Sequence, residues 1–400
     1  MTYDILSLII FIPFLILSIG GLGYYLLAIF SVNKLRKSRP QIIPNALNFP
    51  SISLLKPLCG AEPRLEEHLE SFFLQDYPSF QILFAASDET DPAVSIVERL
   101  ISRYPDVPAQ LILTGEPPYA NPKVYRLKKM SEEASGEILV ITDSDASVGP
   151  QYLKYLAADF AAPKIGVVTN LYRGVSEADL WSKLEALGMS TEFMAGVVVA
   201  NQLEGMRFAL GPSMAIRKEI LCEIGGFEAM AEYLADDFLL GHRTFEAGYR
   251  VLLSTFVINH HTTAHGFINS FKHRLFWNRS TRFSRPAGYC GQGFTYGLPW
   301  VLILFSIAPC WWSAIFVAAL LVARLWLAHE LTVLLLEDNK ALGRFWFIPL
   351  QDLMSFAAWV GGFLGREIVW RNERFRLLEG GRIEQKRITK KTKITKQTKS

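Results

Sequence analysis

Hydrophobic residues are concentrated in three long stretches, and a long segment of mixed composition separates the first from the second. Residues 5–32 carry no charge, which exceeds the roughly 20 apolar residues that a helix needs to cross a bilayer. Further apolar zones occupy residues 298–336 and 347–364. We therefore expect a multi-pass membrane protein with an N-terminal transmembrane helix at 1–33 and a C-terminal transmembrane region of two or three spans at 298–366.

A cleaved signal peptide is the alternative interpretation of the first apolar stretch. Such a peptide needs a basic segment before its apolar core, whereas only Asp4 precedes this one, and the stretch is also long for such a core. Four basic residues follow it directly: Lys34, Arg36, Lys37 and Arg39. Because positive charge favours the cytoplasmic side of a membrane, we expect residue 34 onward to lie in the cytoplasm.

Residues 44–286 have the composition of a soluble domain, and short apolar runs alternate there with helical patterns. Strands are expected at 52–56, 81–87, 110–113 and 137–142, with helices near 62–74, 92–103 and 122–134. This alternation is typical of an α/β fold with a doubly wound, parallel sheet. The four cysteines are scattered without metal or disulfide spacing, as expected in a reducing compartment.

Two aspartates, Asp143 and Asp145, end the apolar run at 138–142. A strand with this pattern delivers both carboxylates to the carboxyl edge of the sheet, where open α/β folds bind ligands. Two carboxylates at this spacing suit a hard divalent cation, which can in turn hold a diphosphate. A D-x-D triplet alone is a weak signal, because such triplets are also common in solvated turns.

Further acids stand at two other predicted strand or helix ends. Asp88 follows the run at 81–87 and suits hydrogen bonds from a ribose or base, although Asp88 or Asp91 could equally cap the next helix. Asp236 and Asp237 stand just before an amphipathic helix. They could cap that helix, or one of them could act as a general base for a sugar acceptor.

Three histidines, His260, His261 and His265, follow a probable strand at 250–256. Their spacing matches no closed zinc site, so we interpret them as loop or cleft residues; contact of one histidine with a diphosphate or metal is the alternative. The predicted helix at 180–194 carries Glu185 and Glu192. It could line an acceptor pocket or pack on the sheet.

Several motifs occur in a fixed order along the chain. They are SLLKPLCG at 53–60, FFLQDYP at 72–78, DETDPA at 88–93, NPKV at 121–124, DSD at 143–145, GGF at 225–227, YLADD at 233–237 and WRNERFRL at 370–377. Taken together over about residues 5–380, they resemble the ceramide glucosyltransferase-type family of membrane glycosyltransferases, which have a GT-A domain. The segments 211–218, 233–241 and 285–289 look closer to the hopanoid-lipid glycosyltransferase branch.

The resemblance implies a Rossmann-like GT-A domain with a mostly parallel sheet, flanked by transmembrane helices. It implies transfer of one hexose, glucose or N-acetylglucosamine, from a UDP-sugar to a lipid hydroxyl at the cytoplasmic face of the inner membrane, with inversion. By position, Asp88 would contact the uridine and Lys123 the uracil or diphosphate. Asp143 and Asp145 would bind the donor through Mg²⁺ or Mn²⁺, and Asp237 would be the base.

One motif departs from the family pattern. Where the family has (Gln/Arg)-x-x-Arg-Trp, residues 273–277 read HRLFW, so Phe276 stands in place of an arginine that would help hold the diphosphate. Arg274 or Arg279 could substitute for it, with Trp277 facing the acceptor. The alternative is that the helix near 266–285 is interfacial, its aromatic residues anchoring it while its basic residues face lipid phosphates.

The C-terminal residues 380–400 form a basic segment. From 382 to 399 there are eight Lys or Arg and one acid, which indicates a disordered tail that contacts anionic lipid head groups. A cytoplasmic tail requires an even number of crossings after the catalytic domain, and the sequence leaves that number open. We expect no nucleic-acid partner.

Three other functions remain compatible with the sequence. A processive polysaccharide synthase shares the carboxylates but requires a translocating channel, which the few spans do not favour. A polyprenyl-phosphate glycosyltransferase would use a lipid phosphate as acceptor. A lipid-binding pseudoenzyme is suggested by Phe276, although the intact aspartates argue against it.

Overall fold

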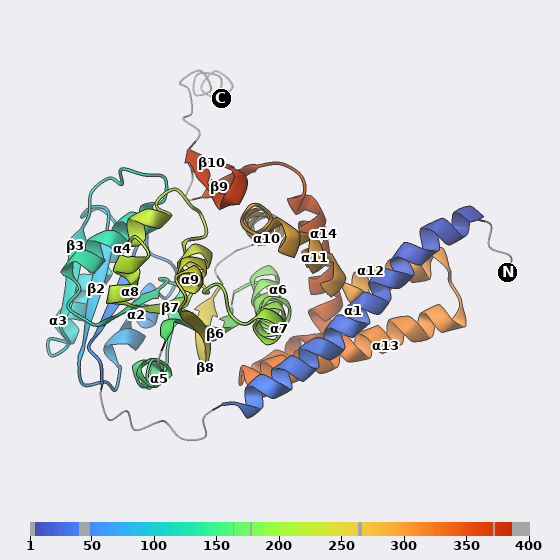
Figure 1. Ribbon diagram of the computed structural model, residues 1–400, viewed down its shortest axis with the longest axis horizontal. Helices are drawn as coiled ribbons and strands as arrows, with labels where there is room; N and C mark the ends of the chain where they lie inside the picture. The colour runs from blue at the N-terminus through green and yellow to red at the C-terminus, as the bar shows by residue number, and fades with distance from the viewer. Residues whose placement is uncertain are drawn as a thin grey trace, which may run out of the picture.

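The computed structural model of the chain describes residues 5–39, 49–162, 164–176, 178–262, 266–370 and 373–385, without the side chains of residues 5–10. Figure 1 shows an α/β domain on one side and long helices extending from it on the other. His265 and residues 386–400 of the predicted basic tail lie outside this range. Residues 380–385, also assigned to that tail from sequence, belong to ordered elements.

One large sheet forms the centre of the α/β domain. Its strands are β1 (Ile52–Pro57), β2 (Phe80–Ala86), β3 (Ala109–Leu113), β4 (Ile138–Thr142), β5 (Ala146–Ser147), β6 (Ile165–Val175), β7 (Ser213–Arg217) and β8 (Arg250–His261). They follow the order β3-β2-β1-β4-β7-β6-β8-β5. Strands β3, β2, β1 and β4 are mutually parallel, as are β6 and β8, whereas β7 and β5 run antiparallel to their neighbours. The mostly parallel α/β prediction is confirmed.

Two helices of this domain, α3 and α4, begin at side-chain caps that the sequence supplies. Asp91 accepts a hydrogen bond from Ala93 N at 2.9 Å before α3 (Pro92–Arg103), and Asn121 accepts one from Lys123 N at 3.0 Å before α4 (Pro122–Glu133). A proline at the first helical position reinforces both starts. The remaining helices of the domain are α2 (Leu65–Phe73), α5 (Tyr152–Asp159), α8 (Lys218–Glu223) and α9 (Asp236–Glu246).

A helical segment separates the sheet from the long helices (Figure 1). It consists of α6 (Leu180–Gly188), the π-helical turn η1 (Met189–Phe193) and α7 (Met194–Glu204). The helix predicted at 180–194 therefore continues ten residues further, through a π-helical turn. Helix α6 packs on β6, and α7 packs on the N-terminal helix. This segment thus contacts both parts of the molecule.

Within the described ranges, two helical segments are long and apolar enough to cross a membrane, Phe11–Lys37 and Trp311–Leu335. The first belongs to α1 (Ile5–Lys37), and the second comprises α13 (Trp311–Ala328) and η4 (His329–Leu335). A bent helical pair is a further candidate: Pro286–Thr295, which comprises α11 (Pro286–Gly291) and η3 (Gln292–Thr295), meets α12 (Gly297–Ile307) at a bend of 58°. Helices α1 and α12 approach each other closely at Gly21 and Gly297. A Cβ on Gly21 would lie 2.2 Å from Gly297 Cα, so the approach requires glycine at position 21.

The remaining C-terminal elements pack back against the α/β domain. Helix α14 (Ile348–Gly362) packs on α6 and on α10 (Gly266–Ser284), and a turn, η5 (Asn339–Phe347), precedes it. A small antiparallel sheet follows, formed by β9 (Glu367–Trp370), β10 (Glu373–Leu377) and β11 (Ile383–Gln385), with η6 (Glu379–Gly381) between the last two. Ile383 N donates to Glu232 O at 2.8 Å, which ties this sheet to the loop before α9.

Candidate active site at the carboxylate cluster

Three loops bring acids and one lysine together at the edge of the large sheet. Asp143 follows β4, Lys123 lies in the first turn of α4, and Asp236 begins α9. The Lys123 Nζ atom lies 2.8 Å from Asp143 Oδ1 and 3.3 Å from Asp236 Oδ2. The sequence motifs containing Lys123 and Asp143 therefore meet in space, and Asp236 joins them rather than serving only as a helix cap.

Asp237 lies beside this group and is held by main-chain donors. Its Oδ2 accepts from Gly211 N at 2.8 Å and its Oδ1 from Phe238 N at 2.7 Å. A Cβ on Gly211 would lie 3.0 Å from Asp237 Oδ2 and 3.3 Å from Asp143 Oδ2, so a larger residue would crowd both carboxylates. Burial, followed by the charge of Asp236, raises the pKa of Asp237 to about 6, which suits a general base near neutral pH.

Asp145 supplies a carboxylate that the protein leaves only partly satisfied. Burial raises the pKa of Asp145, and His260 Nδ1 lies 3.5 Å from its Oδ1. That buried oxygen accepts no hydrogen bond within the described part of the chain. Among the residues that the structure describes, no group of three or more His, Cys, Asp or Glu is placed to hold a metal. The donor set thus fits a hard cation with two protein carboxylates, leaving its other positions to diphosphate and water.

Lys56 is a functional candidate that the sequence analysis missed. It lies in the buried strand β1, is fully buried, and its Nζ donates to the main-chain oxygen of Asp143 at 2.7 Å. The Phe72 ring lies beneath it at 3.9 Å. Burial lowers the pKa of Lys56 to about 7. The signal in the sequence was a lysine inside an otherwise apolar strand, ISLLKP.

His260 and His261 both contact Asp145. The rings of His68 and His261 stack with centroids 3.8 Å apart, and His261 Nε2 lies 2.8 Å from Ser147 Oγ. His261 N donates to Asp145 O at 2.8 Å. His260 and His261 belong to strand β8, which extends five residues beyond the strand predicted at 250–256, so they are not loop residues. His68 was not singled out, because nothing near it in the sequence indicated its stacking partner.

Asp88 lies exposed at the carboxyl end of β2. Its Oδ1 accepts hydrogen bonds from the Thr90 side chain and from Thr90 N, and these bonds lower the pKa of Asp88. The helix cap is Asp91, whose carboxylate also accepts from Gly60 N at 3.0 Å. Asp88 is therefore an ionised carboxylate at the sheet edge, and its contact with uridine stays a prediction.

The residues predicted on α10 make contacts away from the acid cluster. Arg274 is buried and donates to Gln351 Oε1 at 2.7 Å and Ser355 Oγ at 3.0 Å, both on α14. Arg279 donates to the main-chain oxygens of Leu364 and Glu367. Trp277 is half-exposed, and its indole donates to His273 Nε2 at 3.0 Å. These contacts join α10 to the C-terminal elements, and roles in donor binding stay predictions.

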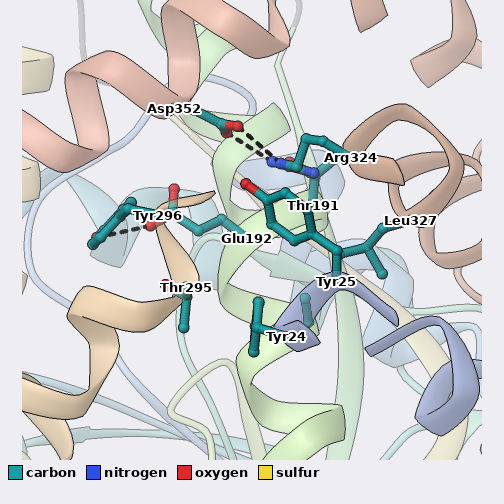
Figure 2. A pocket seen from close by; sticks show the side chains of 10 residues that line it. Tyr24, Tyr25, Thr191, Glu192, Thr295, Tyr296, Arg324, Leu327 and Asp352 are labelled. Carbon is teal, nitrogen blue, oxygen red and sulfur yellow. Dashed lines mark hydrogen bonds and ion pairs between the residues drawn. The ribbon is translucent and has the colours of Figure 1, made fainter. Parts of the chain in front are cut away.

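A small polar pocket lies where η1 meets α1, α13 and α14 (Figure 2). Arg324 of α13 forms two hydrogen bonds with the Asp352 carboxylate of α14, at 2.8 and 2.9 Å. It also donates to Thr191 Oγ1 at 3.1 Å. Tyr296 OH donates to Glu192 Oε1 at 3.1 Å. Of the two acids in the predicted helix at 180–194, Glu192 thus faces this pocket, while Glu185 contacts His273 and Ser270.

Comparison with known proteins identifies a family. Residues 14–383 match glycosyl transferase family 21. Ceramide glucosyltransferase 1 of Caenorhabditis elegans is 26% identical over 358 residues, covering 86% of this chain and 75% of the relative. Ceramide glucosyltransferase of Candida albicans is 35% identical over 118 residues, covering 26% of this chain and 22% of the relative.

The fold also resembles a solved structure. A mannosyltransferase from Pyrobaculum calidifontis, in complex with GDP-Man and Mn²⁺, superimposes with a TM-score of 0.52 at 21% identity. The match covers 88% of this chain and 97% of the mannosyltransferase. This likeness confirms the GT-A architecture that the motifs predicted.

Proposed function

The chain belongs to glycosyl transferase family 21, and from this premise we propose that it transfers one hexose from a UDP-sugar to the hydroxyl of a membrane lipid, inverting the anomeric centre. The observation that carries the proposal is the meeting of Lys123, Asp143 and Asp236 beside Asp237, at the carboxyl edge of the sheet. Ceramide glucosyltransferases among the relatives support a ceramide-like acceptor. A hopanoid acceptor rests on the resemblance of three segments alone.

Each residue of the cluster has its own role in the proposed reaction. Asp237 accepts the proton of the attacking lipid hydroxyl, because its pKa is raised to about 6 and glycine at 211 leaves space beside it. Lys123 places positive charge next to Asp143, where the diphosphate of the donor would lie. Asp143 and Asp145 would hold Mg²⁺ or Mn²⁺, which neutralises charge on the departing UDP when bound.

The position of the cluster relative to the membrane helices supports a lipid acceptor. Helix α7 packs directly on α1, which contains one of the candidate spans. The basic residues after that span, Lys34, Arg36 and Lys37, favour a cytoplasmic α/β domain at the inner membrane. UDP-sugars are cytoplasmic donors in this arrangement, and the acceptor reaches the site from the inner leaflet.

A lipid-extract assay tests the proposal. Membranes containing the protein are supplied with labelled UDP-glucose or UDP-N-acetylglucosamine, with and without EDTA, and the lipids are then separated. We expect a new glycolipid with one of the two donors, lost in EDTA and restored by Mg²⁺ or Mn²⁺. The mass of the aglycone identifies the acceptor. Absence of any labelled lipid, or a labelled polymer instead, would overturn the proposal.

A further inference from the structure

We propose that Phe193, stacked on Tyr172, forms an aromatic wall of the acceptor subsite and holds the apolar part of a hydroxyl-bearing membrane lipid beside Asp237. This inference rests on the proposed function and specifies where its acceptor binds. The two rings are nearly parallel, at an interplanar angle of 27°, with centroids 5.9 Å apart. Phe193 is the last residue of η1 and Tyr172 belongs to β6.

Tyr172 connects this wall to the acid cluster. It is only 6% exposed, and its ring centroid lies 5.4 Å from that of His260, which in turn lies beside Asp145. Burial raises the pKa of Tyr172, and the charges of Asp237, Asp145 and Asp143 raise it further. Through His260 the Tyr172 ring adjoins Asp145, and Phe193 stacks on the same ring from η1.

Phe193 presents an apolar surface next to this charged group. Its side chain is 48% exposed although it is a large aromatic residue. A ring in this position loses water when an apolar chain packs on it, and it offers a flat face at a fixed angle. The neighbouring residues of η1 are turned to other partners, since Thr191 and Glu192 contact Arg324 and Tyr296. Phe193 is thus the side chain of this turn that remains open to a ligand.

The path required of the acceptor leads past this turn. A lipid must bring its hydroxyl to Asp237 while its chains stay among the membrane helices. The turn η1 connects these two regions, because Ser190 Oγ accepts from Gly174 N of β6 at 2.9 Å and Thr191 accepts from α13. Figure 2 shows Thr191 and Glu192 of this turn facing Arg324 and Tyr296. Single π-helical turns within longer helices are frequent at functional sites.

The test compares Phe193→Ala with wild type in nanodiscs that contain increasing mole fractions of the acceptor found in the lipid-extract assay. We expect the acceptor KM of Phe193→Ala to rise about tenfold, because the loss of one aromatic contact corresponds to roughly that factor in binding. We expect kcat and the affinity for UDP to stay within about twofold, because the acid cluster is untouched. Phe193→Leu, which keeps an apolar side chain, should recover part of the lost affinity.

Phe49→Ala is the matched control. Phe49 is 40% exposed and packs on Tyr77 with ring centroids 5.3 Å apart, so it reproduces a half-exposed phenylalanine on a tyrosine outside the acid cluster. An unchanged acceptor KM in Phe193→Ala, or an equal rise in Phe49→Ala, would overturn the inference while leaving the proposed function in place. A wild-type protein that makes no glycolipid would overturn both.

Discussion

At the scale of single residues, Lys56 shows how a buried charge can organise a site without touching a ligand. Its ammonium group is removed from water, lies over the Phe72 ring and donates to the main-chain oxygen of Asp143. A buried charge is costly unless it is paired or hydrogen-bonded. Burial lowers the pKa of Lys56, and the nearby carboxylates of Asp143 and Asp145 oppose this shift. We therefore assign Lys56 the role of fixing the loop that carries these two acids.

Lys56→Met tests this role. Methionine keeps most of the volume but removes the charged donor, so that the Asp143 main-chain oxygen retains only the hydrogen bond from Ala146 N at 3.2 Å. Loss of a hydrogen bond from a charged donor costs about 1–3 kcal/mol and loosens the loop. We expect kcat/KM for the UDP-sugar to fall at least about tenfold, while the acceptor KM stays unchanged. Lys218→Met is the matched control, because Lys218 also donates to a main-chain oxygen, that of Ala134, away from the cluster. Equal losses in the two variants would contradict the assignment.

Asp237 gives the second residue-scale prediction, on the dependence of turnover on pH. The base must be ionised, and burial together with Asp236 raises its pKa to about 6. The turnover rate therefore reaches its maximum above this pKa and decreases as the pH falls through it. This decrease occurs at a pH well above the pKa of an ordinary aspartate. The measurement is kcat/KM for the acceptor between pH 4.5 and 8, at saturating donor and metal.

Asp237→Asn should abolish turnover while UDP binding stays largely intact. A kcat/KM that remained flat down to pH 4.5, or wild-type turnover in Asp237→Asn, would rule out Asp237 as the base.

At the scale of elements, the sequence predicted best those parts whose signals are local. Strand β4 is a complete apolar run, and Asp91 and Asn121 mark the starts of α3 and α4 by their caps. Strand β7 was not predicted, because its place between β4 and β6 depends on antiparallel pairing with both of them. The π-helical turn η1 was also missed, since its irregularity leaves the hydrophobic pattern of the helix unchanged.

In the candidate site, too, local motifs predicted some residues, whereas contacts between distant segments were not predicted. The motifs identified Lys123, Asp143, Asp145 and Asp237 by residue type and order, and the structure places Lys123 beside Asp143 and Asp236. The support for these residues could not be predicted, because it comes from distant segments. The roles of Lys56 under Asp143 and of Gly211 beside Asp237 are visible only once the strands are paired.

The small C-terminal sheet provides a physical reason for Phe276. Leu234, in the loop before α9, forms a hydrophobic cluster with Ile368, Phe375, Leu377 and Ile383 of this sheet, and Phe276 packs against that cluster. Leu234 N also donates to Gly381 O at 3.3 Å. The phenylalanine that replaces the arginine of the family motif thus supports the loop that leads to Asp236 and Asp237.

Phe276→Arg is therefore expected to lower activity rather than restore a diphosphate contact. A guanidinium group inserted at this cluster is costly to bury and displaces the loop before α9. We expect kcat to fall about tenfold or more and thermal stability to decrease, measured on the purified protein in detergent. Ile268→Arg introduces the same residue at an exposed position of α10 and should leave both unchanged. Higher activity in Phe276→Arg would instead support a diphosphate site at this position.

At the scale of the whole molecule, a buried ion pair joins α13, part of a candidate membrane span, to α14, which packs on α6 and α10. Arg324 and Asp352 are the charges that interrupt the apolar zones at 298–336 and 347–364, together with His329 and Glu330. Arg324 and Asp352 are both buried and bond to each other through two hydrogen bonds. Arg324 also reaches Thr191 of η1, so α13, α14 and the turn that carries Phe193 meet at this pair (Figure 2).

Removing one partner of this pair should lower the stability of the protein far more than removing both. Arg324→Met leaves the Asp352 carboxylate buried without its partner, and we expect a loss of about 3–5 kcal/mol in stability. The double variant Arg324→Met and Asp352→Leu contains no buried charge at this position and should recover most of that loss. Thermal unfolding in detergent measures both. The contact from Arg324 to Thr191 is absent in both variants. If the double variant regains its stability but has a higher acceptor KM than the wild type, the pair also positions η1. A double variant as unstable as Arg324→Met would show instead that these helices require the pair itself.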